Sequence, residues 1–409
     1  MKKITLDHPS GFTEGEITIT GSKSESNRLL ILKSLFPQIL IENLSNSDDT
    51  LLTNQALKTI DSIIDINHAG TAMRFLTAYF ATQQNREVLL TGSQRMQERP
   101  IKLLVNALKD LGAEISYEKK NGYPPLRIKG KKITKSKVAL PANVSSQFIS
   151  ALILIAPSLE KGLTIDLIGK LTSAPYVNMT LKILDLLGLD TEFERNQIKI
   201  SASKFIKPTT WLVESDWSSA SYFYSVVALS SKSHLILSNF NNQSIQGDAA
   251  LPNIYIKLGV NTSFNNGKIT LSKIDNFNFS DSLSIDLRNT PDLAQTIVVS
   301  CLGLGIGCRL TGLHTLKMKE TDRLSALKTE MQKLGAEVHI TENSLELLPI
   351  NKLKRGISID TYNDHRMAMA FAPLALKVPI IINDFRVVSK SYPSFWEDLK
   401  KIKFTQIIN

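Results

Sequence analysis

The segment "LKTEMQKLGAEVHI" (327–340) decides the fold, because its pattern recurs along the chain. Apolar residues spaced as in an amphipathic helix run up to a glycine, and a segment rich in β-forming residues follows. Three other segments share this pattern: "LLVNALKDLGAEISY" (103–117), "TLKILDLLGLDTEF" (180–193) and "LPNIYIKLGVNTSF" (251–264). Glycine tolerates the left-handed backbone that ends many helices. We therefore expect four helices to end at Gly112, Gly188, Gly259 and Gly335.

These glycines are 71 to 76 residues apart, which is too long for a solenoid repeat. The interval suits a compact unit of two helices and several strands. A chain of 409 residues is also too long for one ordinary core. We predict six such units arranged as two similar α/β domains, with a boundary near "TTWLVESDWSSASYF" (209–223), where a Ser-capped helix should begin.

The composition is typical of globular proteins, with 43% hydrophobic and 21% charged residues. No apolar run reaches the roughly 18 residues that a membrane-spanning helix needs. The start, "MKKITLDHPSGF", lacks the apolar core of a signal peptide, so we expect a cytoplasmic protein. Cys301 and Cys308 lie in an apolar stretch without metal-binding neighbours and are interpreted as buried small hydrophobic residues.

The net charge of +10 favours anionic partners without identifying them. Nucleic acid, an acidic membrane surface and small phosphorylated metabolites all fit this charge. The basic run "KGKKITKSK" (129–137) lacks the interleaved aromatic residues of a single-strand binder. It is interpreted as a solvated face.

Basic residues gather at the starts of predicted helices, where free amide groups and the helix dipole attract anions. A cation in that turn is unfavourable unless an anion neutralises it, and ordinary helices place acids there. The pattern therefore predicts an anion site. The cations concerned are Lys23, Arg28, Arg74, Arg99, Lys319, Arg323 and Arg366.

Two simpler interpretations stay open for these charged segments. Each cation could pair with a neighbouring acid, as Arg323 could with Glu320 three residues earlier. "TGSKSESNR" (20–28) does not fit the G-x-x-x-x-G-K-[ST] pattern of a nucleotide-triphosphate loop, so that function is disfavoured.

Several other polar residues are candidates for the same site. We expect Ser145 or Ser146 to cap a helix, whereas Gln147 adds a donor that capping does not require. Asp292 and Glu320 are candidates for proton transfer, although an acid in a first helical turn is often only a partner of the helix dipole.

Read in order, nine motifs resemble those of the 5-enolpyruvylshikimate-3-phosphate synthase family of enolpyruvyl transferases, across essentially the whole chain. "GSKSESNR", "KETDRL" and "YNDHRMAM" are together highly specific. The others are "AGTAMR", "RMQERP", "VSSQF", "TSAPY", "TPDLAQT" and "SKSYPSFW". The resemblance implies an inverse α/β prism fold, in which each of two domains has three βαβαββ repeats. Residues 21–215 would form one domain, and residues 1–20 with 216–409 the other, around a cleft that closes on substrate.

The resemblance also implies the reaction. The enolpyruvyl group of phosphoenolpyruvate would pass to the 5-hydroxyl of shikimate 3-phosphate, with release of phosphate, in chorismate and aromatic amino acid biosynthesis. It implies no metal ion and no organic cofactor, no nucleic-acid or membrane partner, and a monomer. Glyphosate would occupy the phosphoenolpyruvate site, where Gly70 leaves room for it.

Individual roles follow from the same resemblance. The catalytic residues would be Lys23, Asp292 and Glu320. Asp292 would take the 5-hydroxyl proton, Glu320 would protonate the methylene carbon, and Lys23 would contact both ligands; how the three divide the proton transfers stays open. The residues expected to bind shikimate 3-phosphate are Lys23, Ser24, Arg28, Ser145, Ser146, Gln147, Ser173, Asp292 and Lys319. Those expected to bind phosphoenolpyruvate are Lys23, Gly70, Arg99, Gln147, Arg323, Arg366 and Lys390.

The chain departs from the family pattern at Thr20, His68, Phe75 and Thr315, which puts individual contacts in doubt but leaves the charged set complete. A second enzyme of this fold, the UDP-N-acetylglucosamine enolpyruvyl transferase, characteristically has a lysine–asparagine pair. Here Lys23 is followed by Ser24, which disfavours that activity. A non-enzymatic nucleic-acid binder would spread its cations along an exposed stripe. Here the seven cations named above are spread over the chain at predicted helix starts, which favours a focal site.

Overall fold

The computed structural model describes residues 2–143, 145–169 and 171–409, which divide into two compact units. Unit 1 combines Met1–Thr20 with Glu214–Asn409, and unit 2 is Gly21–Val213. The chain therefore leaves unit 1 after one short segment, forms all of unit 2, and returns. Both units contain helices and strands, which confirms the predicted α/β class.

Unit 1 contains three four-stranded sheets within its described residues, with strand orders β14-β15-β13-β2, β16-β17-β19-β18 and β20-β21-β1-β22. Their strands are β1 (Lys3–Asp7), β2 (Phe12–Ile17), β13 (Lys232–Ser238), β14 (Val260–Asn265), β15 (Lys268–Lys273), β16 (Ser282–Asp286), β17 (Gly307–Thr311), β18 (Val338–Ile340), β19 (Ser344–Leu347), β20 (Ile357–Ile359), β21 (Ile380–Asn383) and β22 (Thr405–Ile408).

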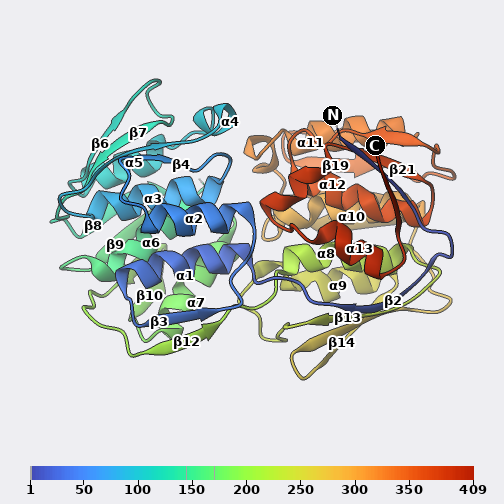
Figure 1. The fold of residues 1–409 in the computed structure, drawn as a ribbon, viewed down its shortest axis with the longest axis horizontal. Coiled ribbons are helices and arrows are strands. Elements are labelled where there is room, and N and C mark those ends of the chain that lie inside the picture. The colour runs from blue at the N-terminus through green and yellow to red at the C-terminus, as the bar shows by residue number, and fades with distance from the viewer. Residues whose placement is uncertain (1, 144, 170) are drawn as a thin grey trace. The chain divides into compact units, whose positions relative to one another are not determined.

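The sheets of unit 1 share one topology. In each, a parallel pair is followed by two antiparallel strands, as in β16 and β17 with β19 and β18. In each sheet a buried helix precedes the second parallel strand, and another helix leads to the last strands; between β2 and β13 the chain also forms the whole of unit 2. In the third sheet, β1 from the start of the chain lies between β21 and β22, so the two termini lie side by side (Figure 1).

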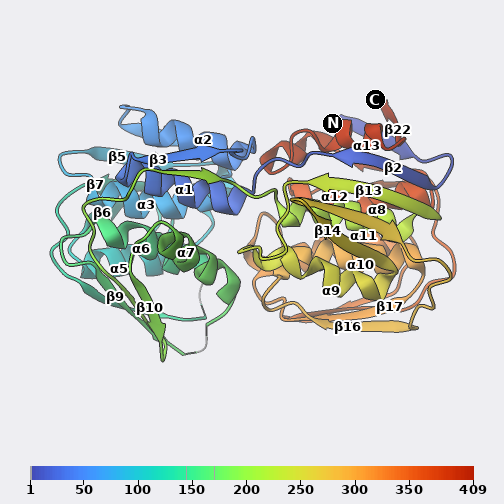
Figure 2. The same cartoon turned by 90° about the horizontal axis from the view of Figure 1, so that it is seen from below.

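In its described residues, unit 2 contains two four-stranded sheets of the same topology, β4-β5-β7-β6 and β10-β11-β9-β8, and a parallel two-stranded sheet, β12-β3 (Figure 2). Their strands are β3 (Ile39–Glu42), β4 (Ile63–Asp65), β5 (Glu87–Thr91), β6 (Glu114–Tyr117), β7 (Leu126–Lys129), β8 (Lys137–Pro141), β9 (Leu163–Ile168), β10 (Thr191–Glu194), β11 (Gln197–Ile200) and β12 (Thr209–Leu212).

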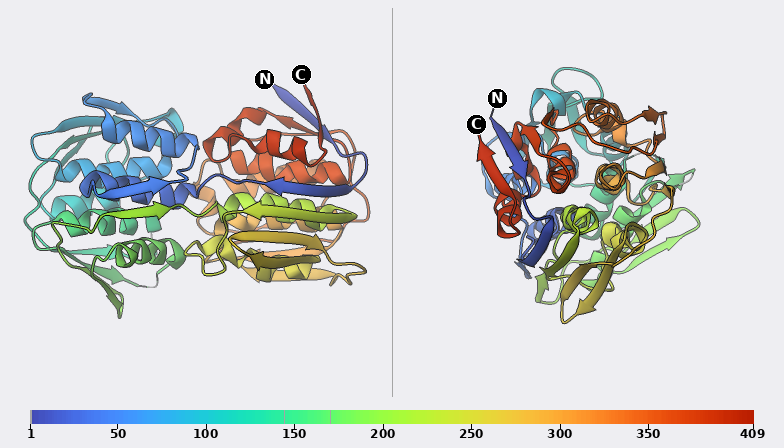
Figure 3. Two further views of the ribbon diagram at one scale, coloured as in Figure 1. Left: turned by 60° about the horizontal axis from the view of Figure 1, so that its bottom comes forward. Right: turned by 90° about the vertical axis from the view of Figure 1, so that its right-hand side faces the viewer.

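Each unit has three buried helices that pack against one another inside its sheets (Figure 3). Helices with buried residues on all sides occupy a core rather than its surface. They are α8 (Trp217–Leu229), α10 (Ala294–Leu304) and α12 (His365–Phe371) in unit 1, and α1 (Lys23–Leu35), α3 (Gly70–Thr82) and α6 (Ser146–Ile155) in unit 2.

The remaining helices are shorter or more exposed. The α-helices are α2 (Asp48–Lys58), α4 (Gln94–Gln97), α5 (Lys102–Asp110), α7 (Ala174–Leu186), α9 (Leu251–Tyr255), α11 (Arg323–Lys333) and α13 (Phe395–Lys401). The 3₁₀ turns are η1 (Ala156–Ser158), η2 (Gly247–Ala250), η3 (Ile256–Leu258), η4 (Pro291–Leu293), η5 (Leu316–Met318), η6 (Ala372–Leu376) and η7 (Phe385–Lys390).

Several local predictions are confirmed. Each of the four helix-ending glycines has positive φ: 107° at Gly112, 78° at Gly188, 75° at Gly259 and 98° at Gly335. Both cysteines are buried. Within the part of the chain that the structure describes, no helix is long and apolar enough to cross a membrane.

The prediction of a Ser-capped helix near residue 217 is wrong in the identity of the cap. Asp216 occupies the N-cap of α8, and its Oδ1 accepts a hydrogen bond from the backbone N–H of Ser219 at 2.8 Å. The carboxylate also complements the helix dipole, which a serine hydroxyl does not. The serines that follow lie inside the helix instead.

A buried carboxylate ties α11 to the loop before α12. The Glu330 side chain is fully buried and accepts hydrogen bonds from Tyr362 Oη at 2.6 Å and from the Asp360 backbone N–H at 3.1 Å. Lys333 Nζ lies 2.8 Å from the same carboxylate. Tyr362 and Asn363 both have φ of 54°, in the left-handed region. Such a backbone is unfavourable for these residues and is kept only when surrounding contacts stabilise it. Glu330 provides that support.

We expect Glu330→Ala to lower the melting temperature by roughly 6–20 °C. Removing one partner of a buried charged group lowers the free energy of unfolding by about 3–5 kcal/mol. Each kcal/mol lowers the melting temperature of a unit of this size by roughly 2–4 °C. Circular dichroism on heating measures the change. The control is Glu346→Ala, an exposed glutamate of β19, which should shift the transition little. Equal shifts for the two variants would contradict the role of Glu330.

Candidate active site

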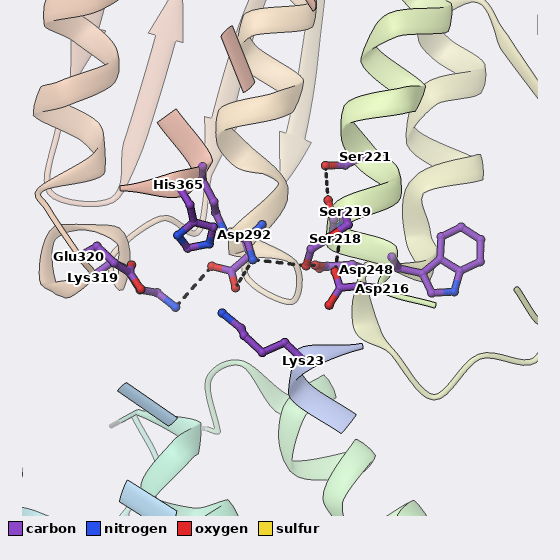
Figure 4. Close-up of polar contacts among 12 residues, drawn as sticks. Lys23, Asp216, Ser218, Ser219, Ser221, Asp248, Asp292, Lys319, Glu320 and His365 are labelled. Carbon is purple, nitrogen blue, oxygen red and sulfur yellow. Dashed lines mark hydrogen bonds and ion pairs between the residues drawn. The ribbon is translucent and has the colours of Figure 1, made fainter. Parts of the chain in front are cut away.

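A cluster of charged side chains lies where several helices of unit 1 begin (Figure 4). Asp292 lies in η4, just before α10, and Lys319 and Glu320 follow η5. The acid–base cluster, as we call it, consists of Asp292, Lys319, Glu320, Arg323, Asp364, Arg366 and Lys390.

Arg323 is the centre of this cluster and is only 2% exposed. It is the first residue of α11, and its guanidinium contacts three carboxylates. Nε donates to Asp364 Oδ2 at 2.7 Å, Nη1 to Asp292 Oδ1 at 3.0 Å and Nη2 to Glu320 Oε2 at 2.8 Å. Burial alone would lower the pKa of Arg323, but these carboxylates raise it above its usual value. The arginine is therefore permanently charged and fixes three acids.

Asp292 is surrounded by cations. Besides Arg323, it accepts a hydrogen bond from Arg366 Nη2 at 3.1 Å, and Lys319 Nζ lies 3.4 Å from Oδ1. Burial alone would raise the pKa of Asp292, but Arg366, Lys319 and Arg323 together hold it well below its usual value. Burial lowers the pKa of Lys319, against the attraction of Asp292.

Glu320 links the remaining cation to the cluster, since Lys390 Nζ lies 3.0 Å from Glu320 Oε1. The cluster thus sets four cations against three carboxylates. The simpler interpretation of Arg323, that it pairs with Glu320, is confirmed. These helix starts carry their own counter-charges, which an incoming anion would have to displace.

In unit 2, the α1 residues Lys23 and Arg28 have different partners. Lys23 is the first residue of α1, and its Nζ lies 3.7 Å from Asp49 Oδ2. Arg28 is buried and donates to neutral oxygens, including Thr180 Oγ1 at 2.8 Å and the Ser24 carbonyl at 2.7 Å. Burial lowers the pKa of Arg28 to about 10. It remains a cation at neutral pH.

Arg99 is a further buried cation of unit 2, at 9% exposed. Its Nε has no hydrogen-bond partner, and among the described residues no carboxylate lies within ion-pair distance of it. Gly70 lies against it: a Cβ added to Gly70 would be 2.4 Å from Arg99 Nη1. The absence of a side chain at residue 70 is what leaves space for this guanidinium.

The prediction that Arg99 belongs to a first helical turn is wrong. Helix α5 begins at Lys102 with Ile101 as N-cap, and the Arg99 backbone N–H bonds to the Met96 carbonyl at the end of α4. The proline that follows disfavours helical backbone at residue 99, so the arginine lies between two helices. Lys319 also lies outside its predicted helix, four residues before α11 begins.

Arg28 and Arg74 lie in the second turns of α1 and α3 rather than the first. Arg74 donates to the Gly70 carbonyl at 3.3 Å and to the Pro100 carbonyl at 3.1 Å. It therefore joins the start of α3 to the segment that holds Arg99. The prediction that Arg74 belongs to an anion site is replaced by this structural contact.

The predicted polar residues of unit 2 lie at the starts of α6 and α7. Ser145 is the N-cap of α6, but its side chain makes no capping hydrogen bond, so the predicted cap is correct only in position. Ser146 is buried. Gln147 Nε2 donates to Thr71 Oγ1 at 3.3 Å, which joins the starts of α6 and α3. Ser173, the residue before α7, has φ of 53°.

The structure thus brings the predicted residues of unit 1 into one cluster and shows partners that the sequence did not reveal. The second role of Asp364 is the clearest of these. It is the N-cap of α12, where its Oδ1 accepts a 2.9 Å hydrogen bond from the Arg366 backbone N–H, and its ion pair with Arg323 depends on tertiary structure. Asp49, Thr180 and Ser150 were not predicted. Among the described residues, no group of three or more His, Cys, Asp or Glu side chains is arranged to hold a metal ion.

Comparison with known proteins identifies the family. The model of EPSP synthase (3-phosphoshikimate 1-carboxyvinyltransferase) matches residues 59–399. The chain belongs to this family. It is similar to the 3-phosphoshikimate 1-carboxyvinyltransferase of Bacteroides fragilis (strain YCH46), with 44% identity over 406 residues and 98% of each chain covered. The enzyme of the same name from Haemophilus influenzae (strain KW20 / Rd) is 36% identical over 437 residues, covering 98% of this chain and 99% of that one.

Solved structures support the fold. An EPSP synthase from Acinetobacter baumannii superposes with a TM-score of 0.78 at 20% sequence identity, covering 100% of both chains. A second structure of the enzyme from the same organism gives a TM-score of 0.76 at the same identity and coverage. The fold of EPSP synthases is therefore shared along the whole chain.

We expect Asp292→Asn to reduce stability at pH 7 and to change its dependence on acid. The folded pKa of Asp292 is lowered, so the stability it contributes is complete above the unfolded pKa of about 3.9 and is lost as pH falls through the folded pKa. The difference in melting temperature between wild type and variant should stay constant from pH 7 to about pH 5 and shrink below about pH 4.

Differential scanning calorimetry across this pH range measures the difference. Asp275→Asn, at an exposed position of unit 1, serves as the control and should match the wild type throughout. A difference that grows on acidification would show that Asp292 is not held as a stabilising anion.

Proposed function

We propose that this protein transfers the enolpyruvyl group of phosphoenolpyruvate to the 5-hydroxyl of shikimate 3-phosphate and releases phosphate, on the route to chorismate and the aromatic amino acids. Family membership supports this reaction. The structural observation that supports it best is the setting of two buried arginines of unit 2, Arg28 and Arg99. Neither forms an ion pair with a carboxylate among the described residues. Each substrate brings a phosphate of about −1.5 to −2 and a carboxylate.

Shikimate 3-phosphate is proposed to bind around Arg28. The serine hydroxyls at the starts of α6 and α7 and the charge of Arg28 suit an oxyanion rich in acceptors. The proposed contacts are Lys23, Ser24, Arg28, Ser145, Ser146, Gln147, Ser173, Asp292 and Lys319.

Phosphoenolpyruvate is proposed to bind through the arginine forks, which match carboxylate and phosphate in a bidentate way. Its anions would replace Asp292 and Glu320 as partners of Arg323 and Arg366. The proposed contacts are Lys23, Gly70, Arg99, Gln147, Arg323, Arg366 and Lys390.

Proton transfer is assigned to Asp292 and Glu320, the two acids that the substrate anions would replace as partners of the arginines. Asp292 is proposed to take the 5-hydroxyl proton, while Glu320 protonates the methylene carbon and Lys23 contacts both ligands. Without substrate, the surrounding cations keep the pKa of Asp292 low, which makes it a weak base. When substrate anions neutralise Arg323 and Arg366, that lowering is reduced and Asp292 becomes more basic.

Attack of the hydroxyl oxygen on the protonated alkene gives a tetrahedral intermediate that carries the phosphate. Reversal of the proton movements expels phosphate, so one acid and one base serve both steps.

The finer architecture is part of the same proposal. We infer an inverse α/β prism of three βαβαββ repeats in each domain, with 21–215 as one domain and 1–20 with 216–409 as the other. The shared sheet topology supports the repeats. Substrate binding would bring the two sets of residues together. We further propose a cytoplasmic monomer that needs no metal ion or organic cofactor.

Release of inorganic phosphate tests the reaction. Purified protein should release phosphate only when phosphoenolpyruvate and shikimate 3-phosphate are both present, even with a metal chelator. Each substrate is omitted in turn, and UDP-N-acetylglucosamine replaces shikimate 3-phosphate in a further arm. Turnover with the nucleotide sugar alone would assign the chain to the sister activity, and no turnover in any arm would reject the proposal.

We expect Asp292→Asn to lower kcat by about 10²–10⁴-fold, the usual effect of removing a general base. The amide keeps the shape of the carboxylate, so the affinity for shikimate 3-phosphate should change by less than about tenfold. Steady-state kinetics and calorimetric titration measure the two quantities, with exposed Asp275→Asn as the control. Near-normal turnover in Asp292→Asn would show that another group takes the proton.

We expect Gly70→Ala to raise the KM for phosphoenolpyruvate and to weaken inhibition by glyphosate. The added methyl would lie 2.4 Å from Arg99 Nη1, so the guanidinium must move. A shift of this kind in a charged contact costs about tenfold or more in affinity. Inhibition at increasing phosphoenolpyruvate measures both effects, and the KM for shikimate 3-phosphate is the internal control. Glyphosate inhibition that is unchanged by the substitution, or not competitive with phosphoenolpyruvate, would contradict the proposed site.

A further inference from the structure

Asp248 and Ser218 form a polar contact next to the acid–base cluster that none of the sequence motifs revealed. Asp248 lies in η2 and is 5% exposed, and Ser218 is the second residue of α8. Figure 4 shows Ser218 between Asp292 and Asp248. Neither residue has a part in the reaction as proposed above, yet both are connected to it by hydrogen bonds.

The hydrogen bonds run in one direction through the serine. Ser218 Oγ donates to Asp248 Oδ2 in a short bond, and Arg366 Nη2 donates to Ser218 Oγ at 3.3 Å. An ionised carboxylate can only accept. The hydroxyl hydrogen is therefore directed to Asp248, and an oxygen lone pair is left for the guanidinium.

Arg366 is held by groups of two kinds. Asp292 Oδ2 accepts from Nη2 at 3.1 Å, and this carboxylate is the one that an anionic substrate would displace. Ser218 and Tyr222, whose Oη lies 3.5 Å from Nη1, are neutral and do not compete for the charge of the substrate. Ser218 therefore stays in place as a support for Arg366 when Asp292 is released.

We propose that Asp248, acting through Ser218, is a positioning residue that orients the Arg366 guanidinium for phosphoenolpyruvate. This proposal rests on the proposed function, because it assigns Arg366 to that substrate. Asp248 itself touches neither substrate. Asp248 orients the hydroxyl group of Ser218, and this hydroxyl group orients the guanidinium of Arg366.

The charges around Asp248 make this positioning sensitive to pH near neutrality. Burial, followed by the charge of Asp292, raises the pKa of Asp248 to about 7, against the opposing effects of Arg366 and Ser218. Asp216, the N-cap of α8, raises it further. Helix α9, which packs on η2, contributes no charged side chain.

Protonation reverses the hydrogen bond. A protonated Asp248 can donate to Ser218 Oγ, and the serine hydrogen is then free to turn toward other acceptors. The orientation of Arg366 should therefore be tightest above about pH 7 and looser below it.

Kinetics of Asp248→Asn and Ser218→Ala at pH 6 and pH 8 test the proposal. At pH 8, each variant should raise the KM for phosphoenolpyruvate about 5- to 10-fold, the usual effect of losing one hydrogen bond. The KM for shikimate 3-phosphate should stay within about twofold of the wild type, and the double variant should be no worse than the worse single one. At pH 6, the ratio of variant to wild-type KM for phosphoenolpyruvate should fall toward one.

A matched control is the exposed pair formed by Asp185 and Thr191, another carboxylate and hydroxyl joined by a hydrogen bond. Asp185→Asn should leave both KM values unchanged at either pH. A KM ratio for Asp248→Asn that is the same at pH 6 and pH 8 would show a merely structural role and overturn the proposal. Equal increases in both KM values would do the same.

A measurement without turnover separates this proposal from the proposed function. The carboxyl ¹³C signal of Asp248, identified by its loss in Asp248→Asn, should titrate near pH 7 and should titrate at higher pH in Ser218→Ala, which removes a donor to the charged form. A titration unaffected by Ser218→Ala would reject the hydrogen-bonded relay even in an active enzyme. Loss of all enzyme activity in the wild type with this titration present would reject only the proposed function.

Discussion

The contact of Arg323 with three carboxylates is the constraint on which the rest of the acid–base cluster depends. A buried guanidinium is stable only when its charge and its donors are satisfied, and here Asp292, Glu320 and Asp364 satisfy both. These three acids come from η4, the segment before α11 and the start of α12. One side chain therefore fixes three segments that are distant in sequence, and the other cations arrange themselves around the same acids.

Under the proposed function, the two units would bind anions in opposite ways. Unit 1 neutralises its cations with its own carboxylates, so a ligand there gains its contacts by exchange. Unit 2 surrounds Arg28 with neutral oxygens and leaves Arg99 without a carboxylate among the described residues, so a ligand there supplies a missing charge. A ligand that replaces a carboxylate in unit 1 can in turn be displaced by that carboxylate, so it is easily released. A buried cation without an ion pair in unit 2 favours the bound ligand. A transferase needs both properties, because product has to leave.

The sequence predicted the parts of the fold that depend on local chemistry. The glycines after four helices could be predicted because the backbone conformation at a helix end depends on neighbouring residues. Arg99 was expected at the start of a helix, but α5 begins at Lys102 and the arginine lies before it. The contacts of Ser218 and Asp248 and the pairing of Asp364 with Arg323 could not be predicted. They join segments 30 and 41 residues apart that only the tertiary structure brings together.

The position of β1 between β21 and β22 determines the order in which the protein can form during synthesis. Unit 2 is one continuous segment and can collapse on the ribosome as soon as it has emerged. In unit 1, β1 cannot complete its sheet until β22 has been translated, because the two strands are neighbours in that sheet. During synthesis β1 therefore lacks its sheet partners β21 and β22 until almost all of the chain has been translated.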